Sequence, residues 1–364
     1  MSALDEAIAR AEGGSALSRQ GAAAAMRDVL SGDSPDAGIA RLLSLLAARG
    51  ETDDELEGML DAMMERCVRA EPPPDGAIDV CGTGGDGART FNVSTAAAFV
   101  AAAAGAKVAK HGNRSSSGGT GSADMLEALG LDLASTRGGA ASAAAGCGVG
   151  FMFAPAFHPA MKAAAAARRA LAGTRTALNL LGPLANPARV RRQLVGVSSD
   201  AHLERLPAML ARRGSECAMG VRSANGLEEL STCSGGEAVI VRRAGGRDRG
   251  DPDGPARAST LRIAVRPEDL GLHASGLAEI VPGNPREALR MMVGAIDGRA
   301  CRAAVETAAL NAGAALVVAG IAGSISDGLG VALEATESGR ASRTLDAFVA
   351  AHGNPDLLEG ARRR

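Results

Sequence analysis

The chain has very few aromatic residues: its 364 residues include six Phe and neither Trp nor Tyr. Proteins that bind single-stranded nucleic acid by stacking the bases need aromatic side chains, so this composition disfavours that class. The net charge of −2 gives no general attraction to nucleic acid or to an anionic membrane. The core must therefore be built from Ala, Leu, Val, Ile and Met.

Cysteine is also sparse, and no two cysteines have the C-x-x-C spacing of a metal or redox motif. The six are Cys67, Cys81, Cys147, Cys217, Cys233 and Cys301. We expect buried, free thiols in a reducing compartment. The N-terminus carries acidic residues and no apolar run, and the alanine-rich runs are too short to span a bilayer. These features predict a cytoplasmic protein that does not contact a membrane.

The first part of the chain has four amphipathic helical patterns joined by short loops, within residues 3–70. Thr52 and Glu55 have the spacing of a capping box at the start of the fourth pattern. Three consecutive prolines at residues 72–74 then interrupt the chain, because proline cannot continue a helix. Residues 1–73 are therefore predicted to form a small helical domain.

The rest of the chain, residues 74–364, alternates short apolar runs with helical patterns. This alternation predicts an α/β domain with a mainly parallel central sheet. The predicted strands lie at residues 77–81, 108–110, 148–153, 194–197, 217–221, 238–242 and 261–265. The clearest predicted helices lie at residues 95–105, 122–130, 301–319 and 329–339. Residues 244–257 are polar and are predicted to form a surface loop.

A glycine-rich run, Gly-Thr-Gly-Gly-Asp-Gly at residues 82–87, follows the first predicted strand directly. Glycines let backbone N–H groups approach an anion without a clash from Cβ. The run lacks the Lys-Ser/Thr of a Walker motif, and its adjacent glycines do not fit a dinucleotide fingerprint. It is either a phosphate-binding loop or an ordinary turn.

Two further segments have the residue types of anion sites. Ser94 and Thr95 begin an alanine-rich helix, where they can cap the helix or receive a phosphate. The run Lys-His-Gly-Asn-Arg at residues 110–114, followed by three serines, ends the second predicted strand. This run is either a second phosphate loop or a solvated basic turn. Open α/β sheets bind ligands at the carboxyl ends of their strands, so two such loops favour a binding site.

These motifs together resemble the anthranilate phosphoribosyltransferases along nearly the whole chain. The matching runs are D-V-C-G-T-G-G-D-G-A-R-T-F-N-V-S-T at residues 79–95, K-H-G-N-R at 110–114, N-L-L-G-P-L-A-N-P at 179–187 and L-N-A-G-A-A-L at 310–316. The resemblance implies transfer of phosphoribose from phosphoribosyl pyrophosphate (PRPP) to the amine of anthranilate, a step of tryptophan biosynthesis. It also implies Mg²⁺, a homodimer formed through the helical domain, and helices around residues 164–190 that join that domain.

The resemblance also implies roles for individual residues. Those expected to bind PRPP are Gly82, Gly85, Asp86, Thr90, Asn92, Ser94, Thr95, Lys110, Ser117, Gly118 and Ser122. Those expected to bind anthranilate are Gly82, Asn113 and Arg168, and those expected to bind Mg²⁺ are Ser94, Glu228 and Glu229. No nucleophile or general base is predicted. Lys110 would stabilise the leaving pyrophosphate, and His111 is either a second electrostatic group or a structural residue.

The chain departs from the family pattern at two places that bear on this site. Glu228 stands where the family has Asp, and the extra methylene shifts a carboxylate that Mg²⁺ needs in near-octahedral geometry. Gly119 stands where lysine is common, so the second loop has one cation fewer. By itself, the Glu228-Glu229 pair can equally be solvated surface, and Arg168 can be an ordinary helix-surface arginine.

Three alternative functions stay open from the sequence. The acceptor can be a substituted anthranilate, or the enzyme can be a nucleoside phosphorylase related to the pyrimidine-specific ones. The third alternative is a non-catalytic relative that binds nucleic acid, with the basic run at residues 189–192 as its support. A sequence pI near 6.3 disfavours this last alternative.

Overall fold

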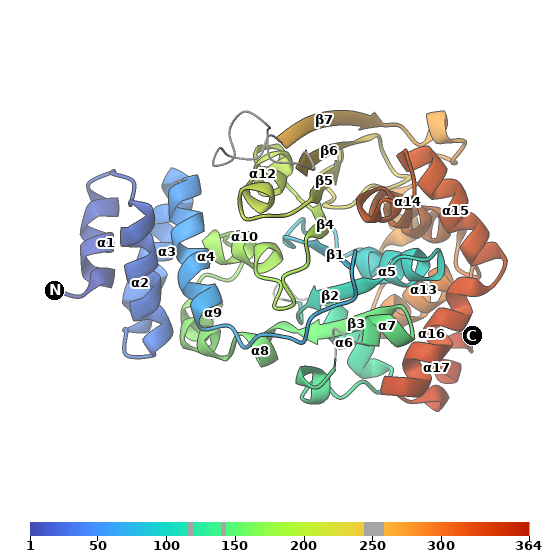
Figure 1. Cartoon of the computed structure of the whole chain (residues 1–364), viewed down its shortest axis with the longest axis horizontal. Coiled ribbons are helices and arrows are strands. Elements are labelled where there is room, and N and C mark those ends of the chain that lie inside the picture. The colour runs from blue at the N-terminus through green and yellow to red at the C-terminus, as the bar shows by residue number, and fades with distance from the viewer. Residues whose placement is uncertain (116–118, 140–142, 244–257, 364) are drawn as a thin grey trace. The chain divides into compact units, whose positions relative to one another are not determined.

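The computed structural model describes residues 1–115, 119–139, 143–243 and 258–363. The chain divides into two compact units, one made of Met1–Ala70 and Ala154–Arg189 and the other of Glu71–Phe153 and Val190–Arg364. The first unit is helical and the second is an α/β unit, so the predicted fold class is confirmed (Figure 1). The loop predicted at residues 244–257 lies outside the described residues.

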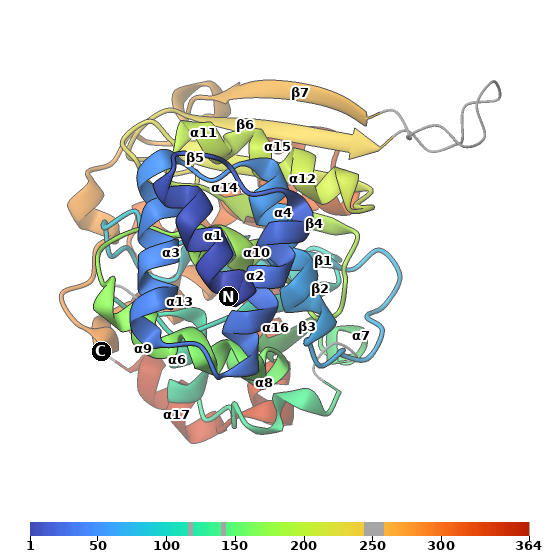
Figure 2. The same cartoon turned by 90° about the vertical axis from the view of Figure 1, so that its left-hand side faces the viewer.

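Four helices at the N-terminus follow the four predicted patterns (Figure 2). They are α1 (Ala3–Glu12), α2 (Arg19–Ser31), α3 (Asp36–Arg49) and α4 (Asp53–Glu65). Thr52 and Glu55 form the predicted capping box at the start of α4. This helix ends at Glu65, before the end of the predicted helical stretch at residue 70. The Val68 N–H donates to the carbonyl of Phe157 at 2.8 Å. The chain after α4 thus pairs with a later segment of the same unit.

Glycine allows α2 and α4 to pack closely within the helical unit. A Cβ on Gly58 would lie 2.1 Å from the Arg19 carbonyl oxygen, which no real Cβ tolerates. The later helices of this unit are α8 (Ala154–Phe157), the 3₁₀ helix η2 (Pro159–Ala164), α9 (Ala165–Ala170) and α10 (Ala177–Leu184).

The α/β unit is built on a seven-stranded sheet in the order β3-β2-β1-β4-β5-β6-β7 (Figure 1). The strands are β1 (Ile78–Gly82), β2 (Val108–Gly112), β3 (Val149–Phe153), β4 (Arg192–Gly196), β5 (Cys217–Ser223), β6 (Gly236–Arg243) and β7 (Ala258–Val265). Strands β3, β2, β1, β4 and β5 are parallel, and β5, β6 and β7 pair antiparallel. The prediction of a mainly parallel sheet is therefore confirmed, and every predicted strand is found.

Helices cover the faces of this sheet, and several of them matter for the site. Helix α5 packs on β1 and β2, α14 packs on β1, β4 and β5, and α12 packs on β5 and β6. The α-helices are α5 (Val93–Ala103), α6 (Ser122–Ala128), α7 (Ala143–Gly146), α11 (Asp200–Leu203), α12 (Arg205–Arg212), α13 (Pro285–Ile296), α14 (Arg302–Ala319), α15 (Ile325–Glu337), α16 (Arg340–His352) and α17 (Pro355–Arg362). The 3₁₀ helices are η1 (Ser135–Arg137), η3 (Glu268–Leu270) and η4 (Leu277–Ile280).

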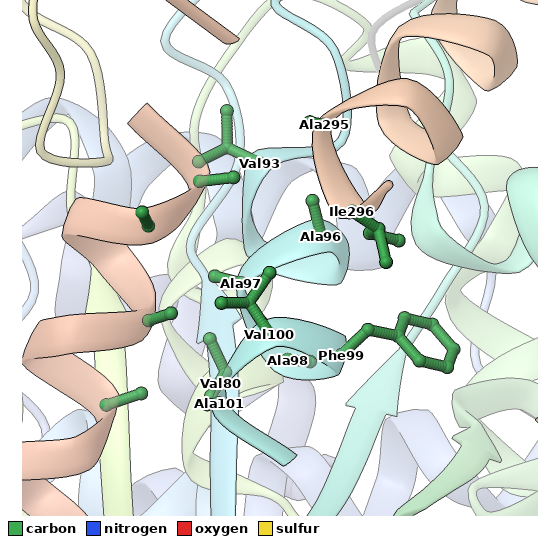
Figure 3. Packing of buried hydrophobic residues seen from close by; sticks show 14 of the residues in the cluster. Val80, Val93, Ala96, Ala97, Ala98, Phe99, Val100, Ala101, Ala295 and Ile296 are labelled. Carbon is green, nitrogen blue, oxygen red and sulfur yellow. The ribbon is translucent and has the colours of Figure 1, made fainter. Parts of the chain in front are cut away.

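The core of the α/β unit uses small side chains where other proteins use aromatic ones. Ala96, Ala97, Ala98 and Ala101 of α5 are fully buried. Helix α13 packs on α5, and Figure 3 shows Ala96 beside Ile296 of α13. Helices α14 and α15 approach so closely that a Cβ on Gly313 would lie 2.6 Å from the Leu329 nitrogen. Close backbone packing thus replaces the contacts that large side chains would make.

Within the described residues, α14 is long and apolar enough to cross a membrane by length and composition. It is 83% buried inside the protein, and core helices pass the same test. The six cysteines are free, as expected, but the expectation that all are buried is wrong. Cys217 is buried, whereas Cys301 is exposed because it precedes the first turn of α14 at the surface.

Candidate functional site

The site is assembled by loops at the carboxyl ends of parallel strands. The glycine-rich loop follows β1, the Lys-His-Gly-Asn-Arg segment spans the end of β2, and an acidic loop with Glu228 and Glu229 follows β5. Because these three strands are parallel in one sheet, their carboxyl ends meet at one edge. The tertiary structure thus brings segments together that lie far apart in the sequence.

The glycine-rich loop uses backbone conformations that favour glycine. Gly84, Gly85 and Gly87 have φ angles of +69°, +80° and +76°, in the left-handed region. Asp86 accepts a hydrogen bond from the Ala88 N–H at 3.1 Å, which fixes the turn. A side chain at Gly84 or Gly87 would meet open space but would be strained. The conformation of the loop therefore requires glycine at these positions.

The Glu228 side chain lies against this glycine-rich loop. Its carboxylate accepts hydrogen bonds from the Gly84 N–H at 2.5 Å and from the Thr83 hydroxyl at 3.4 Å. In return, the Glu228 N–H donates to the Asp86 carboxylate at 3.4 Å. A Cβ on Gly82 would lie 2.7 Å from the Glu228 carboxylate, so glycine is needed there for this approach. The acidic loop and the glycine-rich loop are thus joined by reciprocal contacts.

Lys110 lies on β2 and is almost fully buried, with 2% of its surface exposed. Its ammonium group donates to the Val80 carbonyl and to the Ser94 hydroxyl, the latter at 3.2 Å. Burial lowers the pKa of Lys110, while the Asp79 carboxylate acts in the opposite direction. The cation is therefore held between β1 and the first turn of α5.

His111 is also buried, and its backbone N–H donates to the Asp79 carboxylate at 3.1 Å. Asp79 is itself fully buried, on β1. The backbone of His111 is thus tied to the neighbouring strand, which fits the structural alternative for this residue.

The start of α5 differs from the prediction in one respect. The helix begins at Val93, with Asn92 at the N-cap, so Ser94 and Thr95 are in the first turn and do not cap it. The Asn92 side chain makes no cap hydrogen bond; it donates to the Thr120 carbonyl at 2.8 Å and accepts from the Thr120 hydroxyl at 3.1 Å. The Thr95 hydroxyl is buried without a hydrogen-bond partner among the described residues. Thr90 precedes this turn and is partly exposed.

The second loop is anchored to its own helix, α6. Arg114 makes an ion pair with Asp124 at 3.0 Å and binds Glu127 with two nitrogens, at 2.6 and 2.7 Å. The Asp124 carboxylate also accepts from the backbone N–H groups of Ser115 and Gly121. These contacts hold both ends of the loop, and the carboxylates of α6 neutralise Arg114.

The remaining candidates of this loop have different surroundings. Asn113 is exposed, and Ser122 begins α6 with its hydroxyl 3.5 Å from the Asn113 carbonyl oxygen. Gly119, where lysine is common in the family, is partly exposed. Ser117 and Gly118 lie outside the described residues.

Carboxylates gather at the acidic loop. Burial, together with the negative charges of Glu228 and Asp86, raises the pKa of Glu229 well above its usual value. A cation at this position would relieve the repulsion, so the donor set suits a hard metal ion. In the described part of the chain, no group of three or more His, Cys, Asp or Glu has the arrangement to hold a metal alone. A metal ion here would need further oxygens from its ligand.

Arg168 lies on α9 of the helical unit. It is partly buried, and burial lowers the pKa of its guanidinium group. Among the described residues it makes no ion pair, whereas its neighbour Arg169 is exposed. A partly buried guanidinium group without a carboxylate suits an anionic ligand.

Three residues of the site were not predicted. Asp79 holds His111, Ser223 donates to the Glu229 carbonyl at 2.7 Å, and Asn311 binds the backbone of Leu230. Asp79 and Asn311 could have been found in the sequence, because each is a polar residue inside an apolar strand or helix. Ser223 could not have been found in this way, because a serine at the end of a strand is common.

Comparisons with known proteins agree with this architecture. The model of the α/β domain of a glycosyl transferase family matches residues 75–342, and the model of its helical bundle domain matches residues 5–67. The fold and the site thus define a glycosyltransferase. An anthranilate phosphoribosyltransferase of Cenarchaeum symbiosum (strain A) is 52% identical over 324 residues, which cover 89% of this chain and 90% of that protein. The chain therefore belongs to the anthranilate phosphoribosyltransferase family.

Solved structures show the same fold. The anthranilate phosphoribosyltransferase of Thermus thermophilus is 35% identical, with a TM-score of 0.80, and the match covers 99% of this chain and 100% of that one. The enzyme of Saccharomyces cerevisiae, solved in complex with PRPP and Mg, is 22% identical with a TM-score of 0.80, over 98% of each chain. Neither the nucleoside phosphorylase alternative nor the nucleic-acid alternative is favoured by these matches.

Proposed function

We propose that this chain transfers the phosphoribosyl group of PRPP to the amine of anthranilate and releases pyrophosphate. The observation that carries the proposal is the meeting of the glycine-rich loop with the acidic loop at the carboxyl edge of the sheet, with Lys110 buried beside them. Backbone N–H groups, a buried cation and paired carboxylates suit a substrate that brings both phosphates and a metal ion. Membership of the family supports this assignment.

The PRPP subsite is proposed to use the residues around these two loops. Gly82, Gly85 and Asp86 would contact the pyrophosphate and ribose, and Lys110 with Ser94 would bind phosphate oxygens. The other proposed contacts are Thr90, Asn92, Thr95, Ser117, Gly118 and Ser122. The buried Thr95 hydroxyl supports its inclusion, because an unpartnered buried hydroxyl is costly unless a ligand satisfies it.

Mg²⁺ fits the donor set of the acidic loop, and Glu228, Glu229 and Ser94 would hold it. When bound, the ion supplies positive charge that stabilises the departing pyrophosphate. The repulsion that raises the pKa of Glu229 supports this role, since a cation would offset it.

The chemistry needs positioning more than acid–base groups. The bond between the ribose anomeric carbon and the pyrophosphate oxygen breaks, and both electrons leave with pyrophosphate. The anthranilate nitrogen then forms the new bond with its lone pair and loses a proton, which becomes acidic on bond formation. Lys110 would stabilise the leaving group, while Asn113 and Gly82 would orient the amine and Arg168 would bind the carboxylate. No residue needs to act as a nucleophile.

Three finer points belong to the same proposal. Anthranilate itself is the proposed acceptor, with substituted anthranilates as the alternative. The chain is proposed to form a homodimer through its helical unit, and to act in the cytoplasm as part of tryptophan biosynthesis. The names of its relatives support the acceptor. The dimer is inferred from the family resemblance, and the cytoplasmic location from the composition and the N-terminal residues.

The direct test follows anthranilate fluorescence with the purified chain, PRPP and Mg²⁺. A chain without Trp or Tyr adds little background fluorescence. We expect fluorescence to fall only when PRPP and the metal are both present. If anthranilate stays unchanged while PRPP binds, the proposed acceptor is wrong, and substituted anthranilates are the next acceptors to assay.

A further inference from the structure

Asn311 is a polar residue in the middle of a helix where its neighbours are small and apolar. It lies on α14 with 1% of its surface exposed, between Leu310 and Ala312, which are fully buried. Burying an amide in such surroundings is costly unless its hydrogen bonds are made. The contacts of Asn311 show how this cost is offset.

One amide group binds both backbone groups of Leu230. The Asn311 Oδ1 accepts from the Leu230 N–H at 3.1 Å, and its Nδ2 donates to the Leu230 carbonyl at 2.7 Å. The second Nδ2 hydrogen donates to the Thr307 carbonyl of the same helix at 2.8 Å. Only a side chain with an adjacent donor and acceptor can make this pair of contacts, so Leu or Ala cannot replace it.

Leu230 directly follows Glu229, so these contacts fix the backbone of the acidic loop. On the other side, the Ser223 hydroxyl donates to the Glu229 carbonyl at 2.7 Å. Two residues further on, the Thr232 N–H donates to the Thr307 hydroxyl at 3.4 Å. The backbone of residues 229–232 is thus anchored to β5 and α14, while Glu228 is joined to the glycine-rich loop.

We propose that Asn311 is a positioning residue, which holds Glu228 and Glu229 where they bind the metal ion that accompanies pyrophosphate. The inference rests on the proposed function, which gives that role to the two glutamates. Their like charges oppose close placement, so the loop needs an anchor outside the carboxylates themselves. Residues that orient metal ligands typically change metal affinity or activity by about 10–100-fold when replaced.

The test replaces Asn311 with Leu, which is similar in size but can neither donate to Leu230 nor accept from it. The control is Thr336→Val on α15, because Thr336 is also buried and, among the described residues, its hydroxyl bonds to the Ala332 carbonyl of its own helix alone. We expect the Mg²⁺ concentration for half-maximal activity to rise about tenfold in Asn311→Leu, with the KM for anthranilate unchanged. The control should change the melting temperature alone, as followed by circular dichroism.

A second readout needs no turnover: binding of Mn²⁺ in the presence of pyrophosphate, measured by electron paramagnetic resonance of the free ion. Binding should weaken in Asn311→Leu and not in Thr336→Val. If the branched Leu side chain prevents folding, Asn311→Ala removes the same contacts with a smaller side chain. A folded Asn311 variant with unchanged Mn²⁺ binding and unchanged metal dependence overturns the proposal.

Glu229→Gln in the same assays distinguishes a failure of the positioning role from a failure of the metal site. If Glu229→Gln weakens Mn²⁺ binding and the Asn311 variants do not, the positioning role alone fails. If Glu229→Gln also has no effect, the proposed metal site fails, and the role of Asn311 fails with it.

Discussion

The Gly84 N–H donates to the Glu228 carboxylate at 2.5 Å, across 144 residues of sequence. A backbone group of the glycine-rich loop, which is the type of group that binds phosphate, is therefore already bound to a carboxylate of the same chain. A phosphate oxygen of PRPP that uses this N–H must displace Glu228. The long Glu side chain reaches Gly84, and the Asp that the family resemblance implies at this position is one methylene shorter.

Shortening this side chain should ease PRPP binding. In Glu228→Asp, the carboxylate no longer reaches Gly84 as closely, so we expect the KM for PRPP to fall about fivefold, the worth of one net hydrogen bond of about 1 kcal/mol. Steady-state kinetics at saturating anthranilate and Mg²⁺ measure the KM for PRPP. Glu229→Asp is the control, because it shortens the neighbouring carboxylate without touching this contact. An unchanged or higher KM in Glu228→Asp would contradict the view that Glu228 competes with PRPP for the Gly84 N–H.

Arg168 should act on one substrate only. We expect Arg168→Ala to raise the KM for anthranilate by about 10–100-fold, since a hydrogen bond to a charged group is worth about 1.5–3 kcal/mol. The KM for PRPP should stay unchanged. Arg169→Ala removes the same charge from the exposed neighbour and should have little effect. Equal effects of the two variants would show that Arg168 is an ordinary surface arginine.

Gly58 should determine how closely α2 and α4 pack. In Gly58→Ala the new Cβ would clash with the Arg19 carbonyl, so we expect the free energy of unfolding to fall by about 1–3 kcal/mol. Gly38→Ala on α3 is the matched control, because its Cβ would be 3.4 Å from the nearest atom, an ordinary contact with Leu4. That variant should be neutral or gain up to about 1 kcal/mol from helix propensity. Urea unfolding followed by circular dichroism compares the two, and equal stabilities would refute the packing argument.

His158 should make the helical unit less stable in acid. Burial lowers the pKa of His158 from its ordinary value of 6.5, while its hydrogen bond to the Ala185 carbonyl acts in the opposite direction. The unfolded chain thus binds a proton at higher pH than the folded chain does. The stability that His158 contributes is complete above pH 6.5 and is lost as the pH falls through the folded pKa. We expect the unfolding free energy of His158→Gln to decline less steeply below pH 6.5 than that of the unchanged protein. An equally steep decline would contradict this role of His158.

Much of the fold could be predicted because local patterns specified it. The capping box at Thr52 and Glu55 places the start of α4, and the apolar run at residues 77–81 places β1. The prediction failed where the deciding contact is not local. Helix α4 stops at Glu65 because the following chain pairs with Phe157. Ser94 and Thr95 do not cap α5, because the helix begins one residue earlier, and Asn92 at its N-cap binds Thr120.

The sequence by itself determined which residue types could build the site: glycines at positions 82, 84, 85 and 87, a lysine in the segment after the second apolar run, and two adjacent glutamates. These are properties of single residues and short runs, so they need no tertiary information. Only the tertiary structure decided that the Glu228 carboxylate reaches Gly84, that Asn311 anchors Leu230 and that the carboxylates of α6 neutralise Arg114. The parallel sheet brings distant loops to one edge, and no local pattern encodes which side chains then meet there.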